Sequence, residues 1–218
     1  MIDRYILPIQ KRLLQPLANR LVEHGVSANM ITITGFVIGM TALPLLALQQ
    51  YVLALVVILV NRFHDGLDGA VARSTSPTDR GAFMDIALDF FFYATVPLGF
   101  AIADPQANAL AAATLITAFV GTGSSFLAFS VMAGKRGLAA QDYPQKGIYY
   151  LGGLTEGAET IAFFAVMCLL PGRFAELAYV FAALCLLTTV TRWVQGWQTF
   201  KTSDDPSAMA DHTANEKP

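Results

Sequence analysis

The stretch NRFHDGLDGAVARSTSPTDRGAFMDIALD, residues 61–89, places four aspartates inside or beside segments that otherwise look membrane-spanning. They are Asp65, Asp68, Asp85 and Asp89. A charged side chain at the centre of a bilayer costs about 2.5–3.5 kcal/mol on insertion scales. Two pairs of such residues with helical spacing therefore need a shared physical reason, and a bound cation is the simplest one.

The spacing predicts two helices that face one another. On the first helix, two aspartates at i and i+3 share one face with small residues at i+4 and i+7. On the second helix, a glycine and two aspartates recur every four residues and so share one face as well. The first face comprises Asp65, Asp68, Gly69 and Ala72, and the second comprises Gly81, Asp85 and Asp89. The polar turn between them, residues 74–80, is short enough to make the helices antiparallel neighbours. The four carboxylates would then form an oxygen cage for one or two magnesium or manganese ions.

The composition is that of an integral membrane protein with one domain. Of 218 residues, 55% are hydrophobic and 14% are charged, and the mean hydropathy is +0.51. Six apolar stretches are long enough to span a bilayer, at residues 29–48, 51–73, 82–103, 107–133, 150–171 and 174–197. We therefore predict an all-α integral membrane protein whose six transmembrane helices form one domain at residues 26–198.

The two ends of the chain are predicted to lie outside the bilayer. Residues 1–25 repeat apolar residues every three or four positions with basic residues between them, which predicts an amphipathic helix in the membrane interface. Residues 199–218 are polar and predict a disordered tail. Basic residues concentrate before the first span, in the second and fourth turns and after the last span. By the positive-inside rule both termini and the aspartates should face the cytoplasm.

The aspartate region resembles a known signature. The order Asp65-x2-Asp68-Gly69-x2-Ala72-Arg73, followed by Gly81-x3-Asp85-x3-Asp89, is similar to that of the CDP-alcohol phosphotransferase (CDP-alcohol phosphatidyltransferase) family. The gap between Arg73 and Gly81 is one residue shorter than is usual there, and the shortening falls in the turn. Together with LTEGAET at residues 154–160, the pattern resembles a poorly characterised branch in the bacterial inner (cytoplasmic) membrane.

The resemblance implies an enzyme that transfers a substituted phosphate from a CDP-linked donor to the hydroxyl of a small polar alcohol, releasing CMP, in phospholipid biosynthesis. The donor would most often be CDP-diacylglycerol. It implies two magnesium or manganese ions held by Asp65, Asp68 and Asp85, with Asp89 as a further ligand and the general base. By position, the nucleotide would lie against Gly69, Ala72, Arg73 and Gly81. The family forms homodimers, and no feature indicates nucleic-acid binding.

Residues that would bind the acceptor alcohol are less strongly indicated. The basic group Lys135, Arg136 and Lys146 is interpreted either as a pocket for an acceptor phosphate or as a topology signal that contacts anionic lipid. Glu156 and Glu159 have three open roles: orienting acceptor hydroxyls, pairing with Arg192 or Lys146, or capping the start of a helix. Glycerol 3-phosphate, inositol phosphate, serine and choline all remain possible acceptors.

Several neighbours of the aspartates carry narrower expectations. Arg62 precedes Asp65 by three residues and is predicted to be its counter-ion, whereas His64 is interpreted as a satisfied core histidine. Asn29 is expected to cap the first span or to line the site. Residues 90–93, FFFY, are expected to face lipid or a dimer partner, with an aromatic substrate box as the alternative. The small residues 121–125 are expected to allow close helix packing, within the bundle or across a dimer interface, with ligand binding as the alternative.

Two other classes of protein also place acidic groups in membrane helices. Intramembrane prenyltransferases bind a magnesium–pyrophosphate between two acidic motifs, but they usually need more spans and lack the continuation from Gly69 to Arg73. A divalent-cation transporter would use the carboxylates as a transport site, but such proteins tend to show internal repeats, and we find none. The aspartate pattern therefore favours a transferase over both of these classes.

Overall fold

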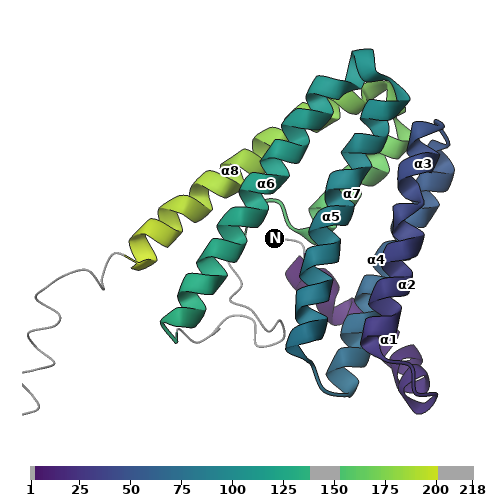
Figure 1. The fold of residues 1–218 in the computed structure, drawn as a ribbon, viewed down its shortest axis with the longest axis vertical. Coiled ribbons are helices and arrows are strands. Elements are labelled where there is room, and N and C mark those ends of the chain that lie inside the picture. Colours follow the sequence, from purple (N-terminus) through teal and green to yellow (C-terminus); the bar gives the residue numbers. More distant parts are fainter. Residues whose placement is uncertain (1–2, 138–152, 201–218) are drawn as a thin grey trace, which may run out of the picture.

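The computed structural model describes residues 3–137 and 153–200, and every regular element in this part of the chain is helical (Figure 1). The elements are α1 (Asp3–Glu23), α2 (Ala28–Met40), α3 (Ala42–Ala47), α4 (Tyr51–Ser74), α5 (Asp79–Ala103), α6 (Pro105–Lys135), α7 (Gly157–Leu169), the short 3-10 helix η1 (Pro171–Arg173) and α8 (Phe174–Phe200). The all-α prediction is thus confirmed for the described residues. Lys146, most of the predicted tail and the start of the fifth predicted span lie outside them.

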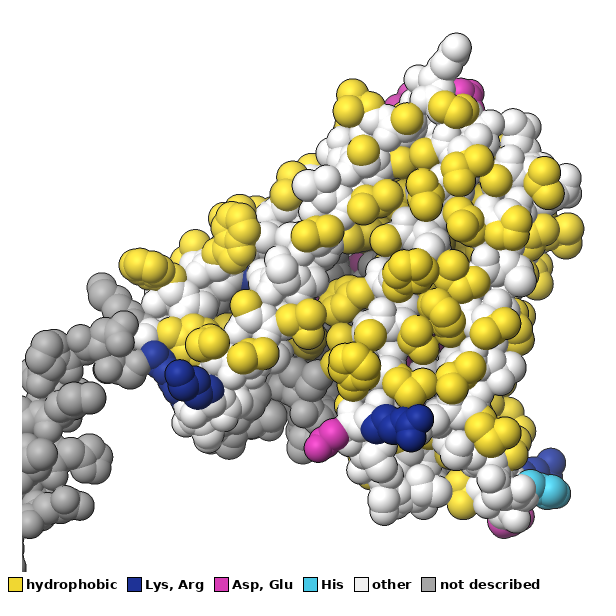
Figure 2. All heavy atoms as spheres, viewed as in Figure 1, with side chains coloured by type: hydrophobic (Ala, Val, Ile, Leu, Met, Phe, Trp, Pro, Cys, Tyr) yellow, Lys and Arg dark blue, Asp and Glu magenta, His cyan; other side chains and the backbone are white. Residues whose placement is uncertain are grey.

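Four helical stretches in the described ranges are long and apolar enough to cross a membrane. They are Ala28–Ala47, Asp79–Ala103, Pro105–Lys135 and Pro171–Phe200. Helix α4 has 24 residues but carries the charged residues of the site, and α7 has 13 residues. Hydrophobic side chains cover most of the face seen in Figure 2, with charged groups near its two ends. These features are those of a multi-pass membrane protein.

Two of the predicted spans differ in the structure: the first is interrupted, and the helix of the fifth starts later than expected. The first, expected as one helix over 29–48, is divided into α2 and α3 at Thr41. Pro44 explains the division, because its ring would clash with the carbonyl of Met40 in a continuous helix. The fifth, expected from residue 150, begins as a helix only at Gly157. The extended backbone of Glu156 and its capping bonds fix that start.

The helices form two groups that diverge toward one end of the molecule. Figure 1 shows α6 and α8 side by side and angled away from α2, α4 and α5, with α1 lying across the foot of α4. The main core fills the end where the groups meet and includes fully buried aromatic rings, namely Phe92, Phe100, Phe164, Phe174 and Phe181. This arrangement leaves the aspartates of α4 and α5 in the space between the two groups.

The small residues of α6 pack inside the bundle, as one of the two sequence interpretations proposed. A Cβ added at Gly121 would lie 3.0 Å from Oγ1 of Thr189 on α8. A Cβ at Gly123 would lie 3.1 Å from the ring of Phe90 on α5. Glycine therefore lets α6 approach both neighbours closely.

The N-terminal helix α1 packs on α4. Leu14 and Ala18 are buried in a second, smaller apolar cluster that includes Leu67, Ala70 and Val71. Gln15 Nε2 donates a hydrogen bond of 2.7 Å to Oγ of Ser74, the last residue of α4. Helix α1 thus supports the end of α4 that carries the aspartates.

The stacked ring of Phe100 should be a sensitive point of this core. It is fully buried, and its ring centroid lies 4.3 Å from that of Phe174 and 5.5 Å from that of Tyr51. Phe100→Leu should lower the free energy of unfolding by about 1–2 kcal/mol, measured as a lower melting temperature in detergent. Phe91→Leu, on the same helix with a side chain 58% exposed, is the control. Equal shifts for the two variants would contradict this packing.

Candidate metal and nucleotide site

Three of the four aspartates come together between α4 and α5. Carboxylate oxygens of Asp65, Asp68 and Asp85 all lie within 4.8 Å of one another. The i, i+3 spacing places the first two on one face of α4, and α5 brings the third from across the turn. Carboxylate oxygens are the ligands that magnesium and manganese prefer, and a common centre at this separation fits such an ion.

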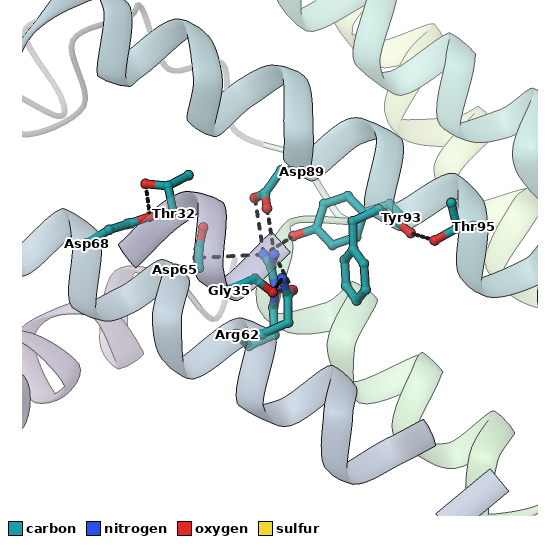
Figure 3. A network of polar contacts seen from close by, with 10 residues as sticks. Thr32, Gly35, Arg62, Asp65, Asp68, Asp89, Tyr93 and Thr95 are labelled. Atoms are coloured by element: carbon teal, nitrogen blue, oxygen red, sulfur yellow. Dashed lines mark hydrogen bonds and ion pairs between the residues drawn. The ribbon is translucent and has the colours of Figure 1, made fainter. Parts of the chain in front are cut away.

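Asp68 is the most enclosed member of the three, with 5% of its surface exposed. The hydroxyl of Thr32 on α2 donates a hydrogen bond of 2.5 Å to its Oδ2 (Figure 3). This bond fixes one oxygen of the carboxylate. Sequence reasoning did not identify Thr32, because it lies on a different helix from Asp68 and 36 positions away in the chain.

The fourth aspartate, Asp89, is held by an arginine. Arg62 Nη2 lies 2.5 Å from Asp89 Oδ1, and Nη1 lies 3.1 Å from Oδ2, so the guanidinium grips both oxygens (Figure 3). Arg62 Nη1 also lies 3.6 Å from Oδ2 of Asp65, which confirms the predicted ion pair with that residue. Arg62 thus contacts both Asp89 and Asp65.

The position of Arg62 is fixed by Asn61 and Tyr93. Its Nε and Nη2 donate to Oδ1 of Asn61 at 2.9 and 2.7 Å, and its Nη1 donates to the Tyr93 hydroxyl at 2.9 Å. Asn61 is itself buried, donates to the carbonyl of Gly35, and lies so close to Gly39 that a Cβ there would be 2.7 Å from its Nδ2. The guanidinium therefore has little freedom to reorient.

A cavity of about 1000 Å³ opens beside the aspartates. Its lining comes from both helix groups and contains all four aspartates together with the four predicted nucleotide positions, Gly69, Ala72, Arg73 and Gly81. Asn29 also lines it, which is one of its two expected roles, and a Cβ added at Gly81 would lie 3.0 Å from Oδ1 of Asn29. The other expected role is wrong, because Ser27 caps α2. Apolar side chains continue the cavity on the other side, among them Phe119, Phe126 and Ile161.

The predicted acceptor residues are divided by the structure. Glu156 and Arg192 line the cavity, whereas Glu159, Lys135 and Arg136 are absent from its described lining. Glu156 and Glu159 form a capping box at the start of α7, one of the three predicted roles. Arg192 is 8% exposed, and its Nη1 donates to the carbonyl of Thr122 at 3.0 Å.

Arg136, a member of the predicted basic group, connects the ends of α6 and α8. Arg136 Nη2 donates to the carbonyl of Phe200 at 2.8 Å, and the guanidinium carbon lies 4.9 Å from the centre of its ring. These contacts join the end of α6 to the end of α8.

His64 is satisfied within the fold, as the sequence interpretation expected, because its Nδ1 lies 2.8 Å from the carbonyl oxygen of Val60.

The aromatic run at residues 90–93 was expected to face lipid or a partner, and for three of its members this is wrong. Phe92 is fully buried in the core, and Phe90 and Tyr93 line the cavity, where Tyr93 accepts a hydrogen bond from Arg62. The helical period explains the difference, since successive residues point to different sides of α5. Phe91 alone fits the expectation clearly, at 58% exposure.

Comparison with known proteins agrees with this geometry. A family model described as CDP-alcohol phosphatidyltransferase matches residues 25–194, and the chain belongs to this family. It is 52% identical to inner membrane protein YnjF of Escherichia coli, over 92% of this chain and 98% of that one. It is 28% identical to archaetidylinositol phosphate synthase of Methanothermobacter thermautotrophicus, over 89% and 93% of the two chains.

The fold is also similar to a solved structure. Phosphatidylinositol phosphate synthase (PgsA1) of Mycobacterium tuberculosis, in its structure with CDP-DAG bound, aligns with a TM-score of 0.64 at 22% identity. The alignment covers 85% of this chain and 94% of that one. Family membership makes the protein a transferase of substituted phosphate groups, of the class that acts in phospholipid biosynthesis.

Proposed function

We propose that the protein transfers a phosphatidyl group from CDP-diacylglycerol to the hydroxyl of a small polar alcohol and releases CMP. The observation that carries the proposal is the meeting of three carboxylates, within 4.8 Å of one another, on the wall of the cavity that the nucleotide-site residues also line. The M. tuberculosis synthase, which shares the fold, has been solved with CDP-DAG bound, and this supports the same donor here.

The reaction would depend on magnesium or manganese, with two ions at the site. Asp65, Asp68 and Asp85 would hold the first ion, and Asp89 would contribute to the second. A further structure of the M. tuberculosis synthase contains manganese and citrate, and it aligns with a TM-score of 0.66 at 21% identity. When bound, such ions neutralise the pyrophosphate of the donor and the phosphate of the departing CMP.

The side chains supply position and a proton acceptor. Gly69, Ala72 and Gly81 line the cavity and would let the cytidine nucleotide approach the helix backbones. Arg73, whose Nη1 lies 3.1 Å from the position of a Cβ at Gly69, would meet a phosphate. The acceptor oxygen forms a bond to the transferred phosphorus while the bond from that phosphorus to the CMP oxygen breaks. The acceptor proton passes to Asp89, which acts as the base within the transition state. Alignment of attack and departure contributes much of the acceleration.

The proposal also concerns how the chain is placed in the membrane. We propose six transmembrane helices, counting α2–α3, α4, α5, α6, the region of α7 and α8, within a domain at residues 26–198. An interfacial helix at residues 1–25 would precede it and a disordered tail at 199–218 would follow. The E. coli relative is an inner membrane protein, which supports the bacterial inner membrane as the location. Both termini are proposed to be cytoplasmic, on the distribution of basic residues. A homodimer is the proposed assembly.

The acceptor is proposed to carry a phosphate. Two similar proteins are named as synthases of inositol phosphate lipids, one from M. thermautotrophicus and one from M. tuberculosis. In this chain, Arg192 is a cation in the cavity lining on the α8 side, opposite the aspartate helices. A guanidinium there is suited to a phosphate by its planar, two-pronged donor geometry. Glu156, on the same side of the cavity, would orient an acceptor hydroxyl.

A panel of acceptors tests the proposal. Purified protein in detergent would receive CDP-diacylglycerol, manganese and one alcohol at a time: inositol phosphate, glycerol 3-phosphate, serine or choline. We expect CMP release and a new lipid with one phosphorylated alcohol only. Release with serine or choline instead would contradict a phosphorylated acceptor. Absence of release with all four, and with other CDP-alcohol donors, would reopen prenyl transfer or cation transport, which the family match otherwise disfavours.

Gly81 gives a prediction specific to the nucleotide. A side chain at this position would meet Oδ1 of Asn29 at 3.0 Å and Oγ1 of Thr78 at 3.2 Å, at the cavity wall. Gly81→Val should raise the KM for CDP-diacylglycerol by about tenfold, the equivalent of a modest overpacking cost. Titration of the donor at fixed acceptor measures this. Gly134→Val, where a Cβ would have no neighbour within 4 Å, should leave the KM unchanged; an equal rise in both variants would contradict the assignment.

A further inference from the structure

Arg62 uses its whole hydrogen-bonding capacity at the site. A guanidinium has five N–H donors, and those of Arg62 are directed to Asn61 twice, to Asp89 twice and to Tyr93 once. Its side chain is 13% exposed, and its guanidinium carbon lies 5.2 and 5.4 Å from the ring centres of Tyr93 and Phe92. These contacts make the Arg62 cation part of the acidic cluster in this structure.

The same contacts set Asp89 apart from the other three aspartates. Asp65, Asp68 and Asp85 form a group with mutual separations that suit one ion, and Asp89 is not a member of that group. Both of its oxygens instead receive hydrogen bonds from Arg62. The void enclosed among Arg62, Thr32 and the four aspartates has a volume of about 10 Å³, which is close to the space that one water molecule needs.

From this geometry we infer that Arg62 is a positioning residue that competes with the second divalent ion for the carboxylate of Asp89. The inference rests on the proposed function, because it assumes that the aspartates bind divalent ions. In the nucleotide-free protein, the three grouped aspartates bind one ion while Arg62 keeps its two bonds to Asp89, and only the longer contact of 3.6 Å between Arg62 and Asp65 is affected. A second ion reaches Asp89 only when the guanidinium of Arg62 gives up its two-pronged contact. The guanidinium and the divalent ion are both positively charged, so they repel one another when both lie beside Asp89.

The consequence is that the two ions bind in order. The first binds to a preformed carboxylate group, and the second binds more weakly because it must displace the bonds from Arg62. The pyrophosphate of a bound donor supplies further negative oxygens and so favours the second ion. Arg62 thereby keeps the second ion, and the activated arrangement of Asp89, dependent on the presence of substrate.

Manganese titration of the full chain in detergent tests this without any assay of activity. Electron paramagnetic resonance measures free manganese, so that the dissociation constants of the two steps can be read separately. In Arg62→Gln the second step should tighten by about tenfold, the worth of roughly one charge-assisted hydrogen bond. Arg62→Lys keeps the charge but loses the two-pronged grip, so its second step should tighten by only about threefold.

Two further variants separate the explanations. Arg173→Gln removes a positive charge from an exposed position, 68% accessible, and should bind manganese as the wild type does. Asp89→Asn should retain the first step and lose the second. A purely structural role for Arg62 predicts weaker binding at both steps, and that result would overturn the inference, as would an unchanged second step in Arg62→Gln and Arg62→Lys.

The first step separates the inference from the function on which it depends. If wild type and Asp68→Asn both fail to bind manganese, the proposed metal site itself is wrong and the inference falls with it. If the first step is present in wild type and absent in Asp68→Asn, the metal site stands. The response of the second step to Arg62→Lys then decides the inference even where Arg62→Gln does not fold.

Discussion

Asp68→Asn should lower the rate of CMP release from CDP-diacylglycerol by at least about a thousandfold. Asp68 is the most buried of the three grouped carboxylates, and one of its oxygens is already fixed by the hydroxyl of Thr32. The amide has the same size but lacks the negative charge that attracts a dication, so the metal site loses a ligand while the helix packing is retained. Initial rates at saturating manganese measure the effect.

The control for Asp68→Asn is the same substitution at Asp79, an aspartate of α5 that does not line the cavity. Asp79 begins α5 and is exposed, so Asp79→Asn should keep the rate within about twofold, as exposed substitutions generally do. The melting temperature of Asp68→Asn should stay near that of the wild type. A variant that is well folded, binds manganese and still releases CMP at the wild-type rate would show that Asp68 does not serve the reaction.

Asp89→Asn should lower kcat by about a hundredfold to ten-thousandfold, the usual contribution of a general base. The carboxylate lies on the cavity wall with a side chain 29% exposed, and Arg62 holds it in one orientation. An amide at this place accepts no proton from the acceptor hydroxyl. The first manganese ion should still bind, since the grouped aspartates do not include this residue.

Tyr93→Phe is the matched comparison for Asp89→Asn. It removes one hydrogen bond from Arg62 and leaves the carboxylate in place, so kcat should fall by less than about tenfold. Rates should be measured at saturating donor and acceptor, so that binding effects appear in KM. If Asp89→Asn and Tyr93→Phe lower kcat equally, orientation of Arg62, and not proton transfer to Asp89, would account for the loss.

The sequence predicted the parts of the site that depend on spacing within one helix. The intervals between Asp65 and Asp68 and between Gly81 and Asp85 were enough to predict two acidic faces, and the short turn was enough to place them opposite one another. The structure confirms that Asp65, Asp68 and Asp85 meet. The pairing of Arg62 with Asp65 was likewise predictable, because an i, i+3 pair lies on one helix face.

What the sequence did not predict depends on how the helices are rotated against one another. The bonds from Arg62 to Asp89 and Tyr93 join residues 27 and 31 positions apart, and no periodicity along α4 reports the rotation of α5. Local breaks were missed for a related reason. A long apolar run at residues 29–48 hides the effect of Pro44, which divides α2 from α3 without changing the hydropathy.

The most direct test of the account is CMP release from CDP-diacylglycerol by the wild-type protein, with manganese present and then removed by a chelator. The account predicts release with a phosphorylated alcohol in the presence of manganese, loss of release on chelation, and recovery when manganese is restored. Release that continues unchanged after chelation would contradict a reaction that depends on the three grouped aspartates and a bound divalent ion.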